Sequence, residues 1–263
     1  PKLQKKTVVF LGNMQGGNPN VCATGFLVSV QGIFHIMTAK HVVFGEKGVV
    51  DDENMEIFFN KKSGEVAARS VSDIKAPFDL EWITHSNDVV DVTMLPFPMK
   101  EEFDVKAIPD DIFLNFDKVH ELHEAFFISY QPGVGQESKV SPIIRSATVS
   151  RKNEDKTFCI DGAAFPGNSG SPVFLKPSPV SFGEEDNSVG GDKFGGKFIG
   201  IIGSYIPYRE KAISAQTGQT RVIFEENTGL SYVWSVDFLE EIMDSQDFKD
   251  QVNRLRDEME SKN

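Results

Sequence analysis

A short glycine-rich segment carries the side chain with the clearest chemical potential. Residues 166–172 read Pro-Gly-Asn-Ser-Gly-Ser-Pro, with Ser169 at the centre. A serine hydroxyl is a poor nucleophile unless a base removes its proton and hydrogen-bond donors await the oxyanion. Flanking glycines allow a sharp turn, which would bring the N–H groups of Gly167 and Ser169 together beside the hydroxyl. Ser169 is therefore a candidate nucleophile and these two N–H groups a candidate oxyanion hole, although the same residue types also favour an ordinary surface turn.

One histidine is placed to act as the base. The chain has five histidines: His35, His41, His85, His120 and His123. His41 directly follows the apolar segment 33–38, and a base needs such a rigid support to hold its geometry. His35 lies inside that segment and is expected to be a residue of the core or of a sheet face, whereas the last three lie in polar surroundings and are expected at the surface.

A carboxylate in an apolar run is the candidate third member. Asp91 lies within the segment 89–95, Val-Val-Asp-Val-Thr-Met-Leu. A charge is costly to bury there unless it is paired, and a histidine N–H is a suitable partner because the pairing fixes the tautomer. Asp88 is the alternative. Asp91 is preferred because the apolar strand follows it at once.

The order of these residues resembles that of the trypsin-like (chymotrypsin-fold) serine peptidases. Residues 38–41 are similar to that family's Thr-Ala-Ala-His, residues 91–95 to its Asp-(Ile/Leu)-Ala-Leu-Leu, and residues 167–172 to its Gly-Asp-Ser-Gly-Gly-Pro. Residues 161–170 resemble the HtrA-type branch more closely, and the likeness extends over about residues 20–245 without a PDZ domain. It implies two packed antiparallel β-barrels, a C-terminal α-helix and a Ser-His-Asp triad.

The sequence also departs from the family pattern. Ser171 replaces the family's second glycine, and the segments 176–197 and 206–228 are unusual insertions. Cleaved zymogens of the family place an aspartate where this chain has Asn168, which offers no charge to a new N-terminal amine. We therefore expect no activation by N-terminal cleavage.

Alignment on the serine predicts the substrate pocket. Ala163 would lie at its base, and Gly203, Ser204 and Tyr205 would form a wall. The segment 162–168 supplies no carboxylate, so a basic side chain is not favoured. We expect small or medium apolar residues before the cleaved bond.

The elements that must position these residues are short strands. Apolar runs predict strands over the segments 7–12, 24–38 with a turn at Gln31 and Gly32, 51–60, 65–72, 89–95, 125–130, 141–150, 157–160, 197–202 and 230–236. We divide the chain into a barrel at 1–105, a linker at 106–122, a second barrel at 123–236 and a helical segment at 237–263. The insertion 176–197 reads as a mobile loop, and 206–228 as an arm with a strand at 221–224. Phe248, Val252, Leu255 and Met259 form one helical stripe.

Composition agrees with an all-β protein and limits its partners. The 263 residues include 22 phenylalanines, 22 glycines and 13 prolines, a mixture that suits many short strands and tight turns. A net charge of −12 disfavours nucleic acid. No apolar run reaches the roughly 18 residues of a membrane span. Cys22 and Cys159 lie in no metal-ligand pattern, so neither metal nor cofactor is expected.

These observations predict a serine endopeptidase that hydrolyses polypeptides through an acyl-enzyme. The alternative is a catalytically silent trypsin-like binding module. An α/β-hydrolase esterase is disfavoured because no histidine follows Ser169. We expect a cytoplasmic location, with periplasmic or secreted locations as alternatives. Oligomeric state is left open.

Overall fold

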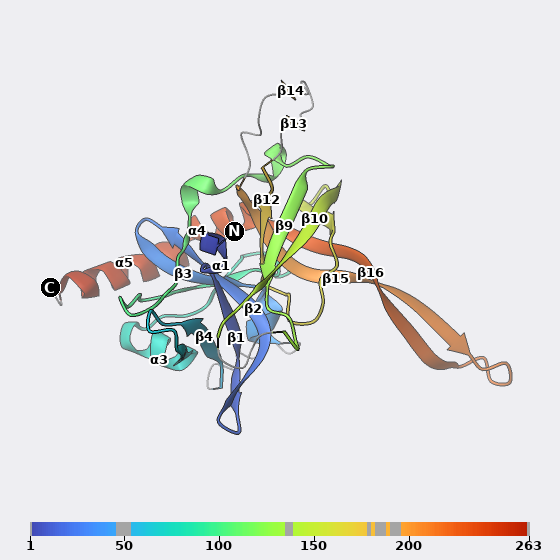
Figure 1. Cartoon of the computed structure of the whole chain (residues 1–263), viewed down its shortest axis with the longest axis horizontal. Coiled ribbons are helices and arrows are strands. Elements are labelled where there is room, and N and C mark those ends of the chain that lie inside the picture. The colour runs from blue at the N-terminus through green and yellow to red at the C-terminus, as the bar shows by residue number, and fades with distance from the viewer. Residues whose placement is uncertain are drawn as a thin grey trace.

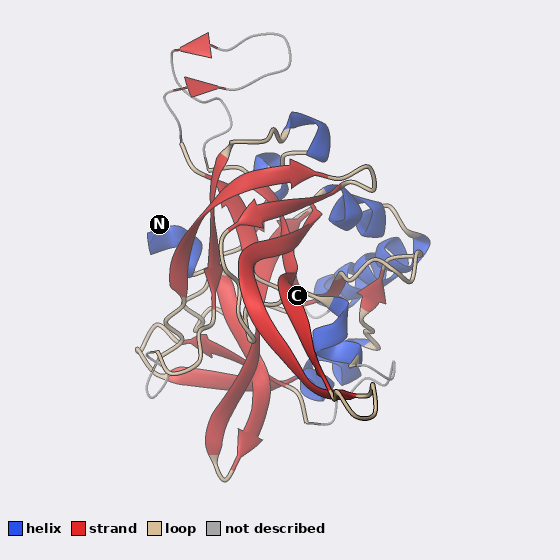
Figure 2. Cartoon of the chain, turned by 90° about the vertical axis from the view of Figure 1, so that its right-hand side faces the viewer, coloured by secondary structure: helices blue, strands red, loops and turns tan. Residues whose placement is uncertain are grey.

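The chain forms two β-structures, and most helices lie on one side of them, with the N-terminal helix on the other side (Figures 1 and 2). The computed structural model describes residues 2–45, 54–134, 139–177, 180–181, 188–189 and 196–261. Strands dominate, and the all-β class predicted from the sequence is confirmed. No helix in these ranges is long and apolar enough to cross a membrane.

The N-terminal half forms one eight-stranded sheet in the order β5-β4-β1-β2-β3-β7-β6, with β8 paired to β2. Its strands are β1 (Val8–Gln15), β2 (Asn18–Val30), β3 (Ile33–Thr38), β4 (Glu56–Asn60), β5 (Val66–Ser70), β6 (Ile83–Thr84), β7 (Thr93–Pro96) and β8 (Ile108–Pro109). The predicted turn between β2 and β3 is present, with positive φ at Gln31 and Gly32. Such a turn matches the twist of the two strands.

The C-terminal half closes into a barrel in the order β10-β11-β16-β15-β12-β9. Its strands are β9 (Glu124–Ser129), β10 (Ile143–Lys152), β11 (Thr157–Asp161), β12 (Pro172–Leu175), β15 (Phe198–Ile213) and β16 (Thr220–Ser235). A separate pair is formed by β13 (Val180–Ser181) and β14 (Ser188–Val189). Most of the insertion predicted as a mobile loop over 176–197 lies outside the described residues.

Alternation along the strands divides the apolar side chains between cores. In β1, Val8 and Phe10 join a core shared by the two halves, while Val9 and Leu11 join a core of the first half. The shared core continues across the halves, where the rings of Phe26 and Phe198 lie 5.3 Å apart. The two halves therefore pack through a common apolar layer.

Short helices connect the strands and two longer ones close the chain. They are α1 (Lys2–Lys5), α2 (Lys40–Phe44), α3 (Val71–Lys75), η1 (Ala76–Phe78), η2 (Asp110–Ile112), η3 (Phe116–Lys118), α4 (Asp237–Met243) and α5 (Gln246–Ser261). The predicted stripe is buried at Phe248, Val252 and Leu255. The side chain of Met259 lies outside the described residues.

The predicted arm is present as a long ribbon. Residues 207–213 of β15 pair with residues 220–227 of β16, beyond the barrel wall. Figure 1 shows this ribbon projecting from the body of the molecule. The segments 197–202 and 230–236 are thus the inner ends of two 16-residue strands.

Two expectations about local environment were wrong. The strand expected over 89–95 begins only at Thr93, because a turn precedes it in which the Val90 N–H donates to the Asn87 carbonyl. His85 and His123, expected at the surface, are buried. The Nε2 atom of His85 lies 2.8 Å from the carboxylate of Glu241, which is 156 residues away in the sequence. The polar residues next to His85 in the sequence do not indicate this partner.

Candidate active site

His41 lies in the first turn of α2, directly after β3. This strand is held between β2 and β7 in the sheet, so the backbone before the histidine is fixed on both sides. The side chain of His41 remains 49% exposed. A general base needs a fixed backbone and a ring that the substrate can reach, and His41 has both.

Asp91 contacts His41 through both carboxylate oxygens. Its Oδ1 accepts the backbone N–H of His41 at 2.8 Å, and its Oδ2 lies 2.7 Å from the ring Nδ1. Because a carboxylate only accepts, the proton must sit on Nδ1, which leaves Nε2 free to accept another. The hydrogen bond to Asp91 raises the pKa of His41 above its ordinary value; partial burial opposes this shift, and the charge of Asp91 reinforces it.

Asp88, the alternative acid, points elsewhere. Its carboxylate is fully exposed and lies 3.5 Å from the Lys40 ammonium. The structure therefore brings Asp91, and not Asp88, to His41.

Ser169 lies in a turn that is hydrogen-bonded to the first half of the chain. The Thr24 hydroxyl donates to the Gly167 carbonyl at 2.8 Å, and the Thr24 N–H donates to the Ser169 carbonyl at 3.2 Å. A Cβ at Gly170 would lie 2.3 Å from the Thr38 hydroxyl and 3.1 Å from the Ala39 nitrogen. The turn is thus packed against the residues that immediately precede His41.

The hydroxyl of Ser169 donates to the Gly203 carbonyl at 3.1 Å. Within the described part of the chain this is its single hydrogen bond, and none joins it to His41.

The backbone N–H groups of Gly167 and Ser169 are the candidate oxyanion donors. Gly167 has φ of 95°, a conformation favoured by glycine. Among the described residues neither the Gly167 N–H nor the Ser169 N–H has an acceptor. Two free N–H groups in one turn can bind a developing negative charge.

Asn168 holds this turn in place. It is fully buried; its Nδ2 donates to the Tyr130 carbonyl at 2.5 Å, and its Oδ1 accepts the Phe165 N–H at 2.9 Å. Both contacts are neutral and lie within the C-terminal half of the chain. They order the turn by a route that needs no N-terminal amine.

The predicted pocket residues lie beside a network that the sequence did not reveal. The Ser231 hydroxyl accepts the Ala164 N–H and donates to the Gly162 carbonyl, while Asn227 Nδ2 donates to the Ala164 carbonyl at 2.6 Å. These contacts fix the backbone on both sides of Ala163, which is half-buried.

Hydrogen bonds from the arm hold one residue of the predicted pocket wall in place. Glu225 accepts a hydrogen bond from the Tyr205 hydroxyl at 2.6 Å and one from Arg209 Nε at 2.7 Å. The hydrogen bond from Tyr205 lowers the pKa of Glu225, with a further contribution from Arg209. Gly203 lies against Trp234, since a Cβ there would meet the indole nitrogen at 2.7 Å, and Ser204 is exposed.

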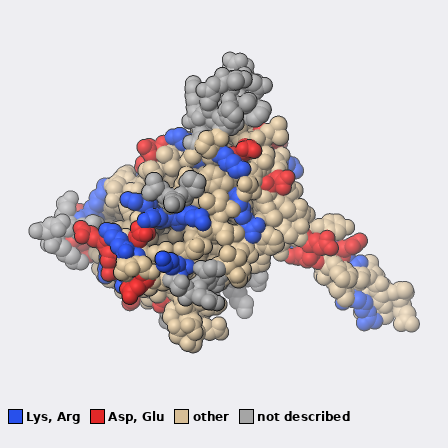
Figure 3. Space-filling view, viewed as in Figure 1, with Lys and Arg blue, Asp and Glu red and all other residues tan. Residues whose placement is uncertain are grey.

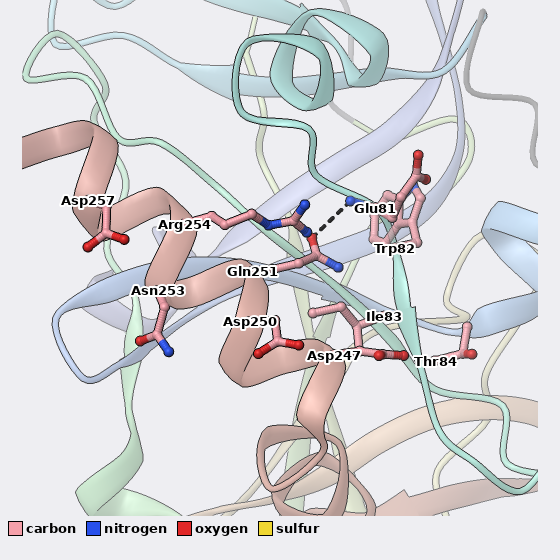
Figure 4. A pocket seen from close by; sticks show the side chains of 10 residues that line it. All are labelled: Glu81, Trp82, Ile83, Thr84, Asp247, Asp250, Gln251, Asn253, Arg254 and Asp257. Carbon is pink, nitrogen blue, oxygen red and sulfur yellow. Dashed lines mark hydrogen bonds between the residues drawn. The ribbon is translucent and has the colours of Figure 1, made fainter. Parts of the chain in front are cut away.

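The larger of two described cavities lies away from this site. It has a volume of about 690 Å³ and lies between the segment 81–84 and α5 (Figure 4). Gln251 Oε1 accepts the Glu81 N–H across it at 2.9 Å. Its lining includes the carboxylates of Glu81, Asp247, Asp250 and Asp257 but no histidine, cysteine or serine, and we assign it no chemistry. Among the described residues no cluster of three metal-ligating side chains is found, and Cys22 and Cys159 are free.

A closed β-barrel packed against a second β-sheet is the architecture of the trypsin-like class of proteins. Residues 23–194 match the family model described as the trypsin-like peptidase domain. The chain therefore belongs to the trypsin-like peptidase domain family.

Solved structures share the fold at low sequence identity. The serine endoprotease from Yersinia pestis matches with a TM-score of 0.52 and 14% identity, covering 94% of this chain and 64% of that one. A variant of the HtrA-type protease AlgW with a decapeptide matches with a TM-score of 0.50 and 14% identity, covering 90% of this chain and 62% of that one. The chain thus spans less than two thirds of either protein. A search of curated proteins finds no match.

Proposed function

We propose that the chain is a serine endopeptidase in which Ser169 attacks the peptide carbonyl. His41 takes the serine proton on Nε2 and later delivers it to the leaving amine. Asp91 holds the Nδ1 proton and stabilises the imidazolium that forms. The observation that carries the proposal is the double contact of Asp91 with the backbone and ring of His41, at 2.8 and 2.7 Å.

The N–H groups of Gly167 and Ser169 would hold the tetrahedral oxyanion. The carbonyl of Gly203 holds the serine hydroxyl in the resting state, and substrate entry would release it by rotation about one bond. The acyl-enzyme on Ser169 would then be hydrolysed by a water molecule that His41 activates. Polypeptides are the substrate class, and the backbone around Ala163 would receive a small or medium apolar side chain.

A catalytically silent binding module is the second candidate. The serine hydroxyl is engaged with Gly203, and Ser171 is buried in place of the family's glycine. Among the described residues the hydroxyl of Ser171 has no hydrogen-bond partner. Both facts would suit a site that binds peptides without cleaving them.

Digestion of an unfolded protein substrate separates the two candidates. We expect the wild type to generate new N-termini, and Ser169→Ala and His41→Ala to generate none. Binding of the same substrate by the wild type with no cleavage would establish the binding module instead. Mapping the new termini would also test the apolar preference, because cleavage after lysine or arginine would overturn it.

A further inference from the structure

The arm, defined as residues 206–228 of β15 and β16, carries an unusual share of the exposed apolar surface. The described residues expose twelve large hydrophobic side chains, and five of them lie on the arm: Tyr208, Ile213, Val222, Ile223 and Phe224. A two-stranded ribbon on its own has little stability in water. Apolar side chains gathered on such a ribbon indicate a surface that another chain covers.

The outer edge of β16 is open along the arm. In the described chain β16 pairs with β11 only over residues 230–234, whereas residues 220–227 pair with β15 alone. Their backbone N–H and C=O groups on the outer side are therefore available to a further strand. An open apolar edge of this length is a template for strand addition.

The sequence of this edge is complementary to itself. Residues 221–225 read Arg-Val-Ile-Phe-Glu, with a cation at one end, an anion at the other and apolar side chains between. In an antiparallel pair centred on Ile223, Arg221 lies opposite Glu225 of the second copy. Val222 then lies opposite Phe224 of the second copy, a β-branched and aromatic pair that stabilises sheets.

We propose that two copies of this chain associate through the outer edges of β16 and form a continuous four-stranded sheet across a two-fold axis. Such an interface uses the same surface on both copies, so it closes at the dimer. The charge distribution of the arm supports a second copy as the occupant. Acidic side chains gather at the root of the arm and basic ones toward its tip (Figure 3), so antiparallel arms bring opposite charges together.

The outer edge of β15 is not self-complementary in the same way. Antiparallel pairing centred on Arg209, Glu210 or Lys211 would place like charges directly opposite each other, which is destabilising. Charged side chains are a common protection of edge strands. The arm thus has one protected edge and one edge suited to its own copy.

The interface ends at the candidate pocket. Glu225 accepts hydrogen bonds from Tyr205 and Arg209 within its own chain. In the dimer Arg221 of the second copy would add a further cation beside it. The proposal does not depend on peptidase activity, so either can fail without the other.

Analytical ultracentrifugation of the full chain tests the proposal. We expect the wild type to sediment at twice the monomer mass of 29.2 kDa across a concentration series. Ile223→Lys puts two ammonium groups on the two-fold axis and should halve the mass. Arg221→Glu and Glu225→Arg should each be monomeric alone, because each opposes like charges twice. An equal mixture of these two variants restores both opposite-charge pairs and should return the dimer.

Ile213→Lys is the matched control, because Ile213 is also exposed but lies on β15. It should remain dimeric. All four positions are exposed, and thermal melting would verify that each variant folds. A wild type that stays monomeric at every concentration would overturn the proposal. So would a dimer that survives Ile223→Lys, or a mixture that stays monomeric.

Discussion

The Nδ1 proton of His41 lies between the ring and Asp91, and this contact governs the expected pH dependence. Only the neutral ring can accept the serine proton. Because the hydrogen bond with Asp91 raises the pKa of His41, peptidase activity should fall as the pH drops through a value above 6.5. The same shift stabilises the folded chain below the unfolded pKa of the ring, and that contribution is lost as the pH rises through the folded pKa.

Asp91→Asn tests this contact. The substitution removes the charge and the acceptor that hold the Nδ1 proton, so kcat should fall by about 10⁴-fold. The acid limb of any residual activity should move to lower pH. A pH profile that keeps the wild-type limb would mean that Asp91 does not set the pKa of His41.

Gly170 is packed so closely against the first half of the chain that a side chain would have no room. It has φ of 84°, and a Cβ would lie 2.2 Å from the Thr24 carbonyl oxygen. Gly170→Ala should lower the free energy of unfolding by clearly more than the roughly 1–3 kcal/mol of backbone strain alone. Gly64→Ala is the control, since Gly64 has φ of 91° but open space around it. An equal loss of unfolding free energy in urea titrations of the two variants would contradict the close packing at Gly170.

At this scale the sequence indicates the candidate site residues more clearly than the residues that hold them in place. Ser169, His41 and Asp91 can be proposed from the sequence because each stands in a local segment that resembles a family motif. Thr24 and Asn227 are not visible, because they act on backbone carbonyls 143 and 63 residues away. Any short polar side chain could make such a contact, so no local pattern marks them.

Strand β2 is the element that joins the first half to the nucleophile turn. Thr24 on this strand is buried; its hydroxyl donates to the Gly167 carbonyl and accepts the Tyr130 N–H at 2.9 Å. Thr24→Val keeps the shape but removes the partner of the buried Tyr130 N–H, at about 1–3 kcal/mol, and that of the partly buried Gly167 carbonyl. We expect lower stability and a lower kcat, because the oxyanion turn loses its anchor. Thr24→Ser keeps the hydroxyl and should retain most of both.

The boundary between α4 and α5 cannot be found from the hydrophobic periodicity of the sequence. The apolar pattern continues from residue 237 to 259, yet the structure has two helices there. Ser245 ends the run because its hydroxyl accepts the Phe248 N–H at 3.2 Å and begins α5. Serine is a favoured residue at this position, so the signal was present in the sequence but the hydrophobic stripe outweighed it. The arm was predictable because a polar segment still held a β-prone strand.

The whole molecule depends on contacts between halves that a sequence pattern does not encode. Alternating strands predicted the all-β class, and the family match confirms it. Phe26 contacts Phe198, and Thr24 donates to the Gly167 carbonyl, only when the two halves pack together. For the same reason, the environment of His85 was predicted wrongly, since its partner Glu241 comes from the far end of the chain.

The most direct test of the proposed function is labelling by a fluorophosphonate, which reacts only with an activated serine. We expect the wild type to gain one label, mapped by peptide mass to Ser169. Ser169→Ala should gain none, and His41→Ala and Asp91→Asn should label far more slowly, while all three variants keep the wild-type melting temperature within a few degrees. A folded wild type that gains no label, or a label that maps to another serine, would contradict the account.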